Sequence, residues 1–482
     1  MTSQPPQGST PSGSSTTTDQ SPVPPLRSLP GSYGWPVVGP FLDRLHFSWF
    51  QGPEAFFRAR MEKYKSTVFR TNVPPCFPFF AGVNPNVVAM LDVKSYSHMF
   101  DPEIADKRDT FLGDFMPSLG YTGGQRTVPY LDTEETKHTQ IKRFGLDILK
   151  RSSKVWISEL EANLDEAWAK VEADVSSKGS AKFVNPLKLC MFKLLIKCFL
   201  GVDVSESPEI ADSGVSIVDI WFILMLLPTI SQNVFQPLEG IFIHTFAYPS
   251  FLVRRRYNKL ADFIRTRGHE VVQRGVTEYG LSEEEAVHNL FFMIGFNAFE
   301  GFNLLLPDLL NQLLSDQTGL QDRLRVEARQ MGGPVLTFDS VKQMPHIRSL
   351  VYETLRFNPR VPLQYARARK DFRLSSHEAS YDIKKGELLC GYQVLVARDP
   401  VVFDDPESFK PDRFVGEKGT ELLKYLIWSN GPETGTPTES NKQCMGKEYV
   451  VLTASVIVAY LLRRYDSMAG DGSNITALEK VK

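Results

Sequence analysis

The sequence is poor in cysteine and has no surplus of positive charge. Its 482 residues include five cysteines, an odd number, widely spaced and without a Cys-x-x-Cys pair. Neither a disulfide framework nor a structural zinc site follows from such a set, so a reducing intracellular compartment is the plainer expectation. With 54 basic against 56 acidic side chains, the chain lacks the basic excess of a nucleic-acid-binding protein, and we expect no nucleic-acid partner.

The chain also lacks a long hydrophobic run. No segment reaches the ~18 consecutive apolar residues that a membrane-spanning helix needs. The best candidates are Ile220–Leu227, which Pro228 closes, and Val450–Leu462, which predicts a buried core helix. The first is followed by apolar and aromatic residues and then by Arg254–Arg256. That combination suits either peripheral membrane association, with a route for lipid entry, or an ordinary hydrophobic subdomain.

The N-terminal stretch lacks aromatic and basic side chains. Its first 25 residues are mostly Ser, Thr, Pro, Gln and Gly. Such a stretch buries too little apolar surface to offset its ordering entropy, so residues 1–29 are predicted to form a disordered leader. They have neither the positive region nor the apolar core of a secretory signal. A plastid transit peptide is Ser-rich and acid-poor, as here, but normally carries Arg, so plastid import stays open.

What the sequence does contain is enough apolar material for a large core. Hydrophobic residues make up 42% of the chain and aromatic residues 11%. Helical patterning dominates, and no internal repeat is visible. Short stretches with strand character occur at Thr67–Arg70, Pro78–Ala81 and Leu388–Val396. These features predict a mainly helical fold with small sheets.

The most legible helix is predicted from Ser282 to about Leu314. Ser282 precedes Glu285 by three residues, the spacing of a capping box. The segment that follows is apolar on nearly all sides, so the helix must be enclosed by protein. It would span roughly 50 Å, the width of a domain. Pro307 is expected to bend it.

Three local patterns follow one another in the C-terminal part. Glu353-x-x-Arg356 lies in a helical run, where side chains three apart share a face and can pair. FKPDRF adds Arg413, and NKQCMGKEY places Cys444 just before an apolar helix. A helix N-terminus stabilises a thiolate, and Gly446 lets a flat molecule approach the backbone. Each pattern is weak alone, but their order and spacing form a strong signal.

This ordered set resembles the haem-thiolate cytochromes P-450. The resemblance covers roughly residues 30–465 and implies one domain, 30–482, with a mainly α fold and small β-sheets. It implies haem b as cofactor, with Cys444 as the axial ligand of the iron. Glu353, Arg356 and Arg413 match the family's buried ion-pair triad, which supports the cysteine loop and takes no part in the chemistry.

A second part of the resemblance concerns the haem propionates. LDTEETKHTQIKRF is similar to the family helix on which a His and a basic residue four apart reach these groups. His138 and Lys142 are therefore candidates to bind the propionates. The alternative for this pair is a solvated helix face.

Two departures from the general family pattern narrow the resemblance. GFNAFEGF, at Gly295–Phe302, lacks the acid–alcohol pair that delivers protons to bound dioxygen, and Gly431 lies unusually far before Cys444. Both features are similar to the plant branch that metabolises fatty-acid hydroperoxides: allene oxide synthases, hydroperoxide lyases and divinyl ether synthases. These enzymes need no O2, NADPH or redox partner, because the substrate brings an O–O bond that a thiolate-ligated iron cleaves.

The resemblance also assigns roles near the iron. Asn297, on the long central helix, matches the amide that orients the hydroperoxide, although a buried Asn can simply satisfy a helix carbonyl. Phe299 and Phe296 are expected to shape the pocket. Phe111 stands where allene oxide synthases usually carry Phe and lyases Leu, and its aromatic face would stabilise an electron-poor intermediate.

Glu300 is the most informative departure, because the related enzymes usually carry Gly at this place. A carboxylate inside a buried helix is costly unless it is neutral or paired, so a task is expected for it. It is suited to remove the proton whose loss gives a vinyl ether. We therefore expect a divinyl ether synthase acting on 13-hydroperoxides of linoleic or linolenic acid. Hydroperoxide lyase and allene oxide synthase are the close alternatives, and a reductase-dependent monooxygenase is a remote one. A role for Glu300 in packing alone also stays open.

Overall fold

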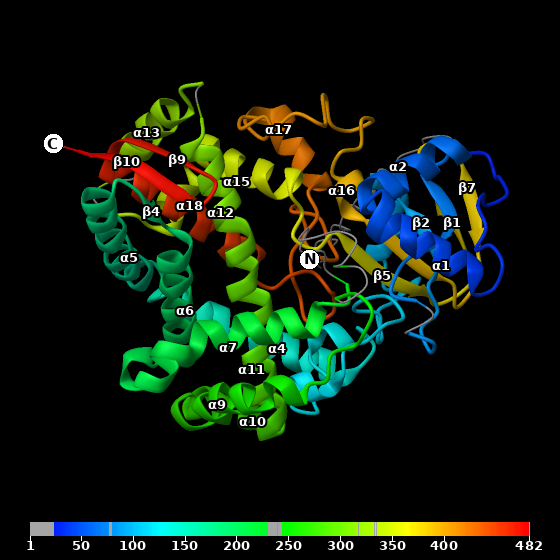
Figure 1. The fold of residues 1–482 in the computed structure, drawn as a ribbon, viewed down its shortest axis with the longest axis horizontal. Helices are drawn as coiled ribbons and strands as arrows, with labels where there is room; N and C mark the ends of the chain where they lie inside the picture. The colour runs from blue at the N-terminus through cyan, green and yellow to red at the C-terminus, as the bar shows by residue number, and fades with distance from the viewer. Residues whose placement is uncertain are drawn as a thin grey trace, which may run out of the picture.

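A large helical body and a smaller strand-rich body lie side by side in the computed structural model (Figure 1). The structure describes residues 24–76, 80–229, 239, 243–316, 318–331, 333 and 335–481. Three parts of the sequence analysis lie outside these described residues. They are residues 1–23 of the expected leader, residues 78 and 79 of the expected strand at 78–81, and residues 230–238 and 240–242 of the apolar stretch after Pro228.

The strand-rich body is built on a five-stranded sheet. Its order is β1-β2-β8-β5-β3, and all neighbours are antiparallel except β2 and β8. The expected strand at Thr67–Arg70 is confirmed as part of β1, whereas the stretch from Leu388 ends as a strand at Tyr392 and continues as the short helix α16 (Gln393–Val396). The strands are β1 (Val68–Asn72), β2 (Asn86–Met90), β3 (Ala105–Asp106), β5 (Leu363–Ala368) and β8 (Leu388–Tyr392).

Two smaller sheets complete the β-structure. A hairpin joins β6 (Phe372–Ser375) to β7 (Ser380–Ile383), and β4 (Ala181–Lys182), β10 (Asn474–Lys480) and β9 (Tyr465–Asp471) form a three-stranded sheet beside α5. Residues 24–27, within the expected leader, lie along β7. The backbone N–H of Arg27 donates to Ser380, and that of Ser380 donates to Pro25.

The helical body holds the largest buried cluster of apolar side chains. Its helices pack mainly as α5 on α6, α7 on α9, and α13 and α15 on α18. The expected core helix at Val450–Leu462 is confirmed as part of α18.

The helices of four or more residues that precede the central helix are α1 (Val38–Leu45), α2 (Pro53–Tyr64), α3 (Val93–Ser97), α4 (Thr136–Ser152), α5 (Trp156–Lys178), α6 (Val184–Leu200), α7 (Pro208–Leu226), α9 (Phe251–Arg267) and α10 (His269–Tyr279), with a π-helical turn at His46–Phe50 and a 3-10 turn at Leu119–Thr122. Those that follow it are α13 (Leu320–Met331), α14 (Phe338–Lys342), α15 (Pro345–Phe357), α16, α17 (Gly416–Leu422) and α18 (Lys447–Arg464), and three-residue 3-10 turns lie at His98–Phe100, Val128–Tyr130, Val204–Glu206 and Leu423–Tyr425.

The long central helix crosses the helical body, as predicted (Figure 1). It begins after Ser282, whose side chain and that of Glu285 form the expected capping box. By length and composition, Glu283–Leu314 is the one described helix that would suit a membrane span, but 61% of its most apolar window is buried in the protein. The helix has three parts: α11 (Glu283–Phe292), a π-helical turn (Met293–Glu300) and α12 (Gly301–Leu314). The π-helical turn was not predicted, and such turns are frequent at functional sites.

The expected triad of Glu353, Arg356 and Arg413 is assembled and almost fully buried. Arg356 donates to both carboxylate oxygens of Glu353 at 2.7 and 2.8 Å, and Arg413 Nε lies 3.0 and 3.1 Å from the same oxygens. Arg356 also donates to the carbonyl oxygens of Ala397 and Pro406. The triad thus ties α15 to the chain that leads into the cysteine loop.

Candidate active site

Cys444 lies in the loop that enters α18, two residues before its N-cap, Gly446. The thiol is half-buried, and burial raises its pKa, although the Gly446 N–H, Lys142 and Lys447 act in the opposite direction. A bound metal cation would lower the pKa of such a thiol and favour the thiolate. Apart from Gly446 itself and its neighbours along the chain, no described atom lies within 4 Å of the place that a Cβ there would take, so the backbone is open to a flat molecule.

The central helix meets the cysteine loop at Gly145 of α4. A Cβ at Gly145 would lie 2.7 Å from the sulfur of Met445 and 3.1 Å from the terminal methyl of Met293. Met445 follows Cys444 directly, and Met293 opens the π-helical turn. The start of the π-helical turn and the cysteine loop therefore meet beside α4.

Asn297 is the exposed residue in a helix segment that is otherwise enclosed. Gly295, Phe299 and Glu300 are buried, and Phe296 and Ala298 are half-buried. The side chain of Asn297 is thus not covered by the neighbouring helices. The alternative of a buried Asn that only satisfies a helix carbonyl does not match this exposure, and the amide of Asn297 is available to a bound molecule.

Aromatic side chains line the same region. The ring of Phe111 lies 5.3 Å from that of Phe296 and 6.4 Å from that of Phe292, and Phe222 of α7 lies 5.4 Å from Phe296. Phe111 and Phe296 are only partly buried. They form an aromatic wall beside Asn297, and Phe222 and Phe292 belong to that wall although the sequence did not point to them.

Phe299 and Glu300 lie elsewhere than expected. The ring of Phe299 is fully buried and packs 5.9 Å from that of Phe192 on α6, so it belongs to the core between helices and not to the exposed face. Glu300 is 6% exposed and lies against Asp219 of α7. Burial, reinforced by Asp219, raises the pKa of Glu300 to about 8.

His138 of α4 is fully buried without a hydrogen-bond partner. Within the described chain, neither of its ring nitrogens makes a hydrogen bond of normal geometry, and the backbone of Glu439 approaches the ring. Burial, together with the positive charges of Lys442 and Lys142, lowers its pKa to about 3. A buried imidazole normally has a hydrogen-bond partner. The partner of His138 is therefore expected to come from a bound group and not from the polypeptide.

Lys142 and Lys442 lie close to His138, and Lys107 lies close to Lys442. Burial lowers the pKa of Lys142 to about 8 and, with a neighbouring lysine, those of Lys107 and Lys442 to about 7. Their ammonium groups donate to backbone carbonyls: Lys142 to Asn441 and Gln443, Lys442 to Val128 and Leu131, and Lys107 to Tyr365. Carbonyl dipoles do not neutralise three charges, so the cluster fits a ligand with more than one negative charge.

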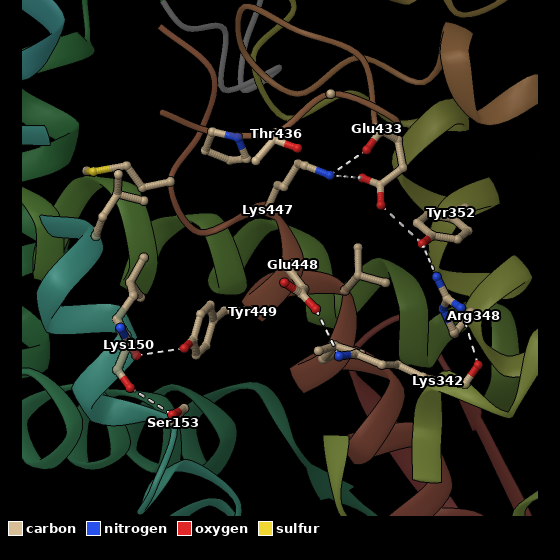
Figure 2. Close-up of a pocket in the computed structure, with 17 residues that line it drawn as sticks. Lys150, Ser153, Lys342, Arg348, Tyr352, Glu433, Thr436, Lys447, Glu448 and Tyr449 are labelled. Carbon is tan, nitrogen blue, oxygen red and sulfur yellow. Dashed lines mark hydrogen bonds and ion pairs between the residues drawn. The ribbon is translucent and has the colours of Figure 1, made fainter. Parts of the chain in front are cut away.

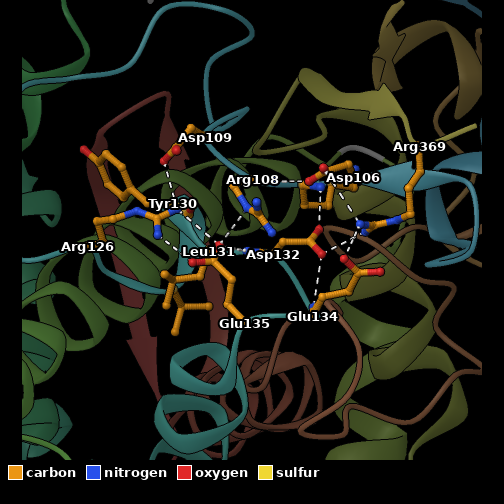
Figure 3. A network of polar contacts seen from close by, with 12 residues as sticks. Asp106, Arg108, Asp109, Arg126, Tyr130, Leu131, Asp132, Glu134, Glu135 and Arg369 are labelled. Atoms are coloured by element: carbon orange, nitrogen blue, oxygen red, sulfur yellow. Dashed lines mark hydrogen bonds and ion pairs between the residues drawn. The ribbon is translucent and has the colours of Figure 1, made fainter. Parts of the chain in front are cut away.

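The nearest carboxylate, Asp132, is already engaged (Figure 3). It accepts from the backbone N–H of Lys107 at 2.7 Å and from Arg369 at 2.8 Å. Burial alone would raise its pKa, but these bonds lower the pKa to about 2. Glu135, at the start of α4, is similarly held by Arg126 at 2.6 Å. This network fixes the beginning of α4 and leaves the lysine cluster without a carboxylate of its own.

A groove of about 600 Å³ borders the other side of the cysteine loop, between α4, α15 and α18 (Figure 2). Its polar side chains pair with one another: Lys447 lies 3.6 Å from Glu433, Lys342 lies 3.1 Å from Glu448, and Arg348 donates to Tyr352. The lining includes neither Asn297 nor the aromatic wall. The groove is therefore separate from the exposed side of Asn297.

Comparisons with known proteins agree with this geometry. A model described as Cytochrome P450 matches residues 309–475. The chain is 54% identical over 479 residues to "Linolenate hydroperoxide lyase, chloroplastic" of Arabidopsis thaliana, covering 98% of this chain and 97% of that protein. It is 56% identical over 460 residues to "Fatty acid hydroperoxide lyase, chloroplastic" of Solanum lycopersicum, covering 95% and 97%. It is 41% identical over 471 residues to "Allene oxide synthase, chloroplastic" of Linum usitatissimum, covering 97% and 85%.

The fold comparison gives the same class. A zebrafish cytochrome P450 solved with abiraterone superposes with a TM-score of 0.63 at 14% identity, covering 86% of this chain and 92% of that chain. The chain belongs to the cytochrome P450 family, and the predicted mainly α fold is confirmed. Within the family it belongs to the plant branch that contains the hydroperoxide lyases and allene oxide synthases.

The residues present fit the haem of this family. Cys444 would supply the thiolate, and the open backbone at Gly446 would admit a flat ring. The unpartnered His138 and the lysines suit the two propionates, which supply the missing negative charges. Lys442 stands within the cysteine motif and was overlooked there, whereas nothing in the sequence marked Lys107.

We expect that replacing His138 with Leu weakens haem retention while the fold is kept. Loss of one hydrogen bond to a charged group costs about 1.5–3 kcal/mol, which corresponds to roughly 10- to 100-fold faster haem loss. The rate of haem transfer to apomyoglobin measures this effect. Lys150→Gln, an exposed change on the same helix, serves as control. An unchanged rate in the His138 variant would contradict the assignment.

Proposed function

We propose that this chain is a fatty-acid hydroperoxide lyase, which splits a 13-hydroperoxide of linoleic or linolenic acid into two aldehydes. The observation that carries the proposal is the 54–56% identity, over nearly the whole chain, to two proteins named as hydroperoxide lyases, against 41% for an allene oxide synthase. The two aldehydes together contain every atom of the hydroperoxide. The reaction therefore needs no O2, no NADPH and no redox partner.

The site residues divide the work of binding and orientation. When bound, the thiolate-ligated haem supplies homolytic cleavage of the O–O bond. The exposed amide of Asn297 holds the hydroperoxide by hydrogen bonds and points it toward the space over Cys444. Phe111 and Phe296 form an apolar wall that excludes water and packs against the diene of the substrate.

Divinyl ether synthesis is a second candidate, because Glu300 favours it. This reaction removes one water from the hydroperoxide and needs a group that takes a proton from carbon. A carboxyl with a pKa near 8 is well matched to that task. Glu300 lies against Asp219, however, and has to turn toward the Asn297 face to act. Under this candidate, Glu300→Gly shifts the product from an ether toward aldehydes or ketols.

Product analysis with one pure substrate tests the proposal. Purified holoprotein is incubated with the 13-hydroperoxide of linolenic acid, without NADPH or reductase, and the products are identified by mass spectrometry. We expect a pair of short-chain and oxo-acid aldehydes. An ether with the intact chain would replace the proposal by the second candidate, and ketols would indicate an allene oxide. A hydroperoxide that remains intact until reductase is added would indicate a monooxygenase.

We expect that Asn297→Ala lowers kcat/KM for the hydroperoxide by about 100-fold, the cost of losing one well-placed hydrogen-bond donor. The Soret spectrum stays normal, because Asn297 holds no part of the haem. Steady-state kinetics and the absorption spectrum measure both effects. Asn311→Ala, on α12 of the same helix, should leave kcat/KM unchanged. Equal kinetics in the two variants would remove Asn297 from the reaction.

We also propose peripheral membrane association in a plastid. Three of the relatives above carry "chloroplastic" in their names. Arg44 of α1 donates to Thr245 at 3.1 Å, so α1 adjoins the segment that leads into α9. Large apolar side chains are exposed on both segments, and three exposed arginines follow. They are Trp35 at 82%, Phe41 at 38%, Phe251 at 64% and Leu252 at 51%, with Arg254, Arg255 and Arg256. Such a surface suits an anionic bilayer.

Co-sedimentation with lipid vesicles tests this surface. We expect binding to vesicles that contain anionic lipid and a clear loss of the bound fraction in the double variant Trp35→Ser, Phe251→Ser. The control exchanges Val326 and Val401 for Ser, which are exposed apolar residues on other parts of the surface. Equal binding by both double variants would contradict the proposed membrane surface.

A further inference from the structure

Three titratable side chains meet beside the π-helical turn. Lys188 of α6 donates to both carboxylate oxygens of Asp219 of α7, each at 2.9 Å. The carboxyl of Glu300 lies against Asp219, and Asn303 of α12 lies beside it. Both α6 and α7 pack on the π-helical turn (Figure 1).

The cluster contains two acids and one base. Only 6% of the Glu300 side chain is exposed, and its Oε1 has no hydrogen-bond partner among the described residues. Two carboxyl groups in contact do not both ionise cheaply, so one proton stays on the pair. Lys188 already spans both oxygens of Asp219, which therefore carries the charge. The proton remains on Glu300.

A protonated Glu300 is a hydrogen-bond donor, whereas an ionised one is not. Its position makes this difference important, because Glu300 is the last residue of the π-helical turn and follows Asn297 by three residues. A bond from Glu300 to Asp219 fixes the end of the turn to α7. The rotation of the turn decides where the amide of Asn297 points.

We propose that Asp219, braced by Lys188, is a positioning residue that holds Asn297 in place through a proton shared with Glu300. The part of this proposal in which Asn297 orients a hydroperoxide rests on the proposed function. The shared proton itself is a property of the resting protein.

The pH dependence has a definite sign. The pKa of Glu300 is raised, first by burial and then by Asp219, and Lys188 opposes the rise. The native state therefore binds more protons than the unfolded chain between the ordinary carboxyl pKa and about 8. As the pH rises above about 8, the proton is lost, two carboxylates face each other, and the end of the turn is released. The groups facing Glu300 are Lys188 from α6, Asp219 from α7 and Asn303 from α12.

Infrared difference spectroscopy of the resting holoprotein tests the shared proton. We expect the wild-type minus Glu300→Gln spectrum to show a protonated carboxyl band that disappears above pH 8. Asp219→Asn should remove the band at neutral pH, because Glu300 then ionises and pairs with Lys188. Asp212→Asn, an exposed change on the same helix, should keep it. If the difference spectrum shows no such band, or if Asp219→Asn leaves it unchanged, the shared proton is refuted.

Kinetics on the hydroperoxide test the positioning role. We expect kcat/KM of the wild-type and Asp212→Asn proteins to fall above pH 8, whereas Glu300→Gln, which stays neutral, shows no such fall. Asp219→Asn should lose at least about tenfold in kcat/KM at pH 7 with an unchanged Soret spectrum, as misplacement of a binding group predicts. An alkaline fall that persists in Glu300→Gln would overturn the positioning role. A wild-type protein that leaves hydroperoxide intact would instead refute the proposed function, and the infrared result would still decide the proton.

Discussion

Buried positive charge without a matching negative charge is the constraint on which the rest of this structure depends. Lys107, Lys142 and Lys442 lie together with the unpartnered His138, and burial lowers the pKa of each. Such a cluster destabilises the folded protein when no ligand is bound. A dianionic ligand at the centre of the cluster stabilises the fold, because it neutralises the lysines. The Asp132 network and the triad of Glu353 fix the start of α4 and the approach to the cysteine loop. The Asp132 network and the Glu353 triad together hold the lysine cluster near Cys444.

The central helix has two faces with different surroundings. Its front presents Asn297 and a wall of aromatic rings, the face at which the proposed function places a lipid hydroperoxide. Its back holds Glu300 against an ion pair between α6 and α7. The π-helical turn joins the two faces, so a proton on the back side controls the geometry of an amide on the front. The carboxyl that first pointed to ether synthesis thus has a structural task that is compatible with lyase activity.

Local sequence signals predicted much of this arrangement. The capping box of Ser282 marked the start of the central helix, and the i,i+3 spacing of Glu353 and Arg356 marked their pairing. The turn within that helix could not be predicted, because packing and not local propensity decides between α and π hydrogen bonding. Phe299 was consequently expected at the pocket, whereas its ring packs on Phe192 in the core. Lys107 was missed because it is far from the cysteine motif in sequence and joins it only in the folded chain.

The central claim is that Cys444 and the basic cluster together hold a haem. The most direct test is the absorption spectrum of the purified ferrous protein under carbon monoxide, recorded for the wild type and for Cys444→Ser. The account predicts the red-shifted Soret band of thiolate ligation in the wild type and its loss in the variant. A wild-type protein without a Soret band, or a thiolate spectrum that survives in Cys444→Ser, would contradict it.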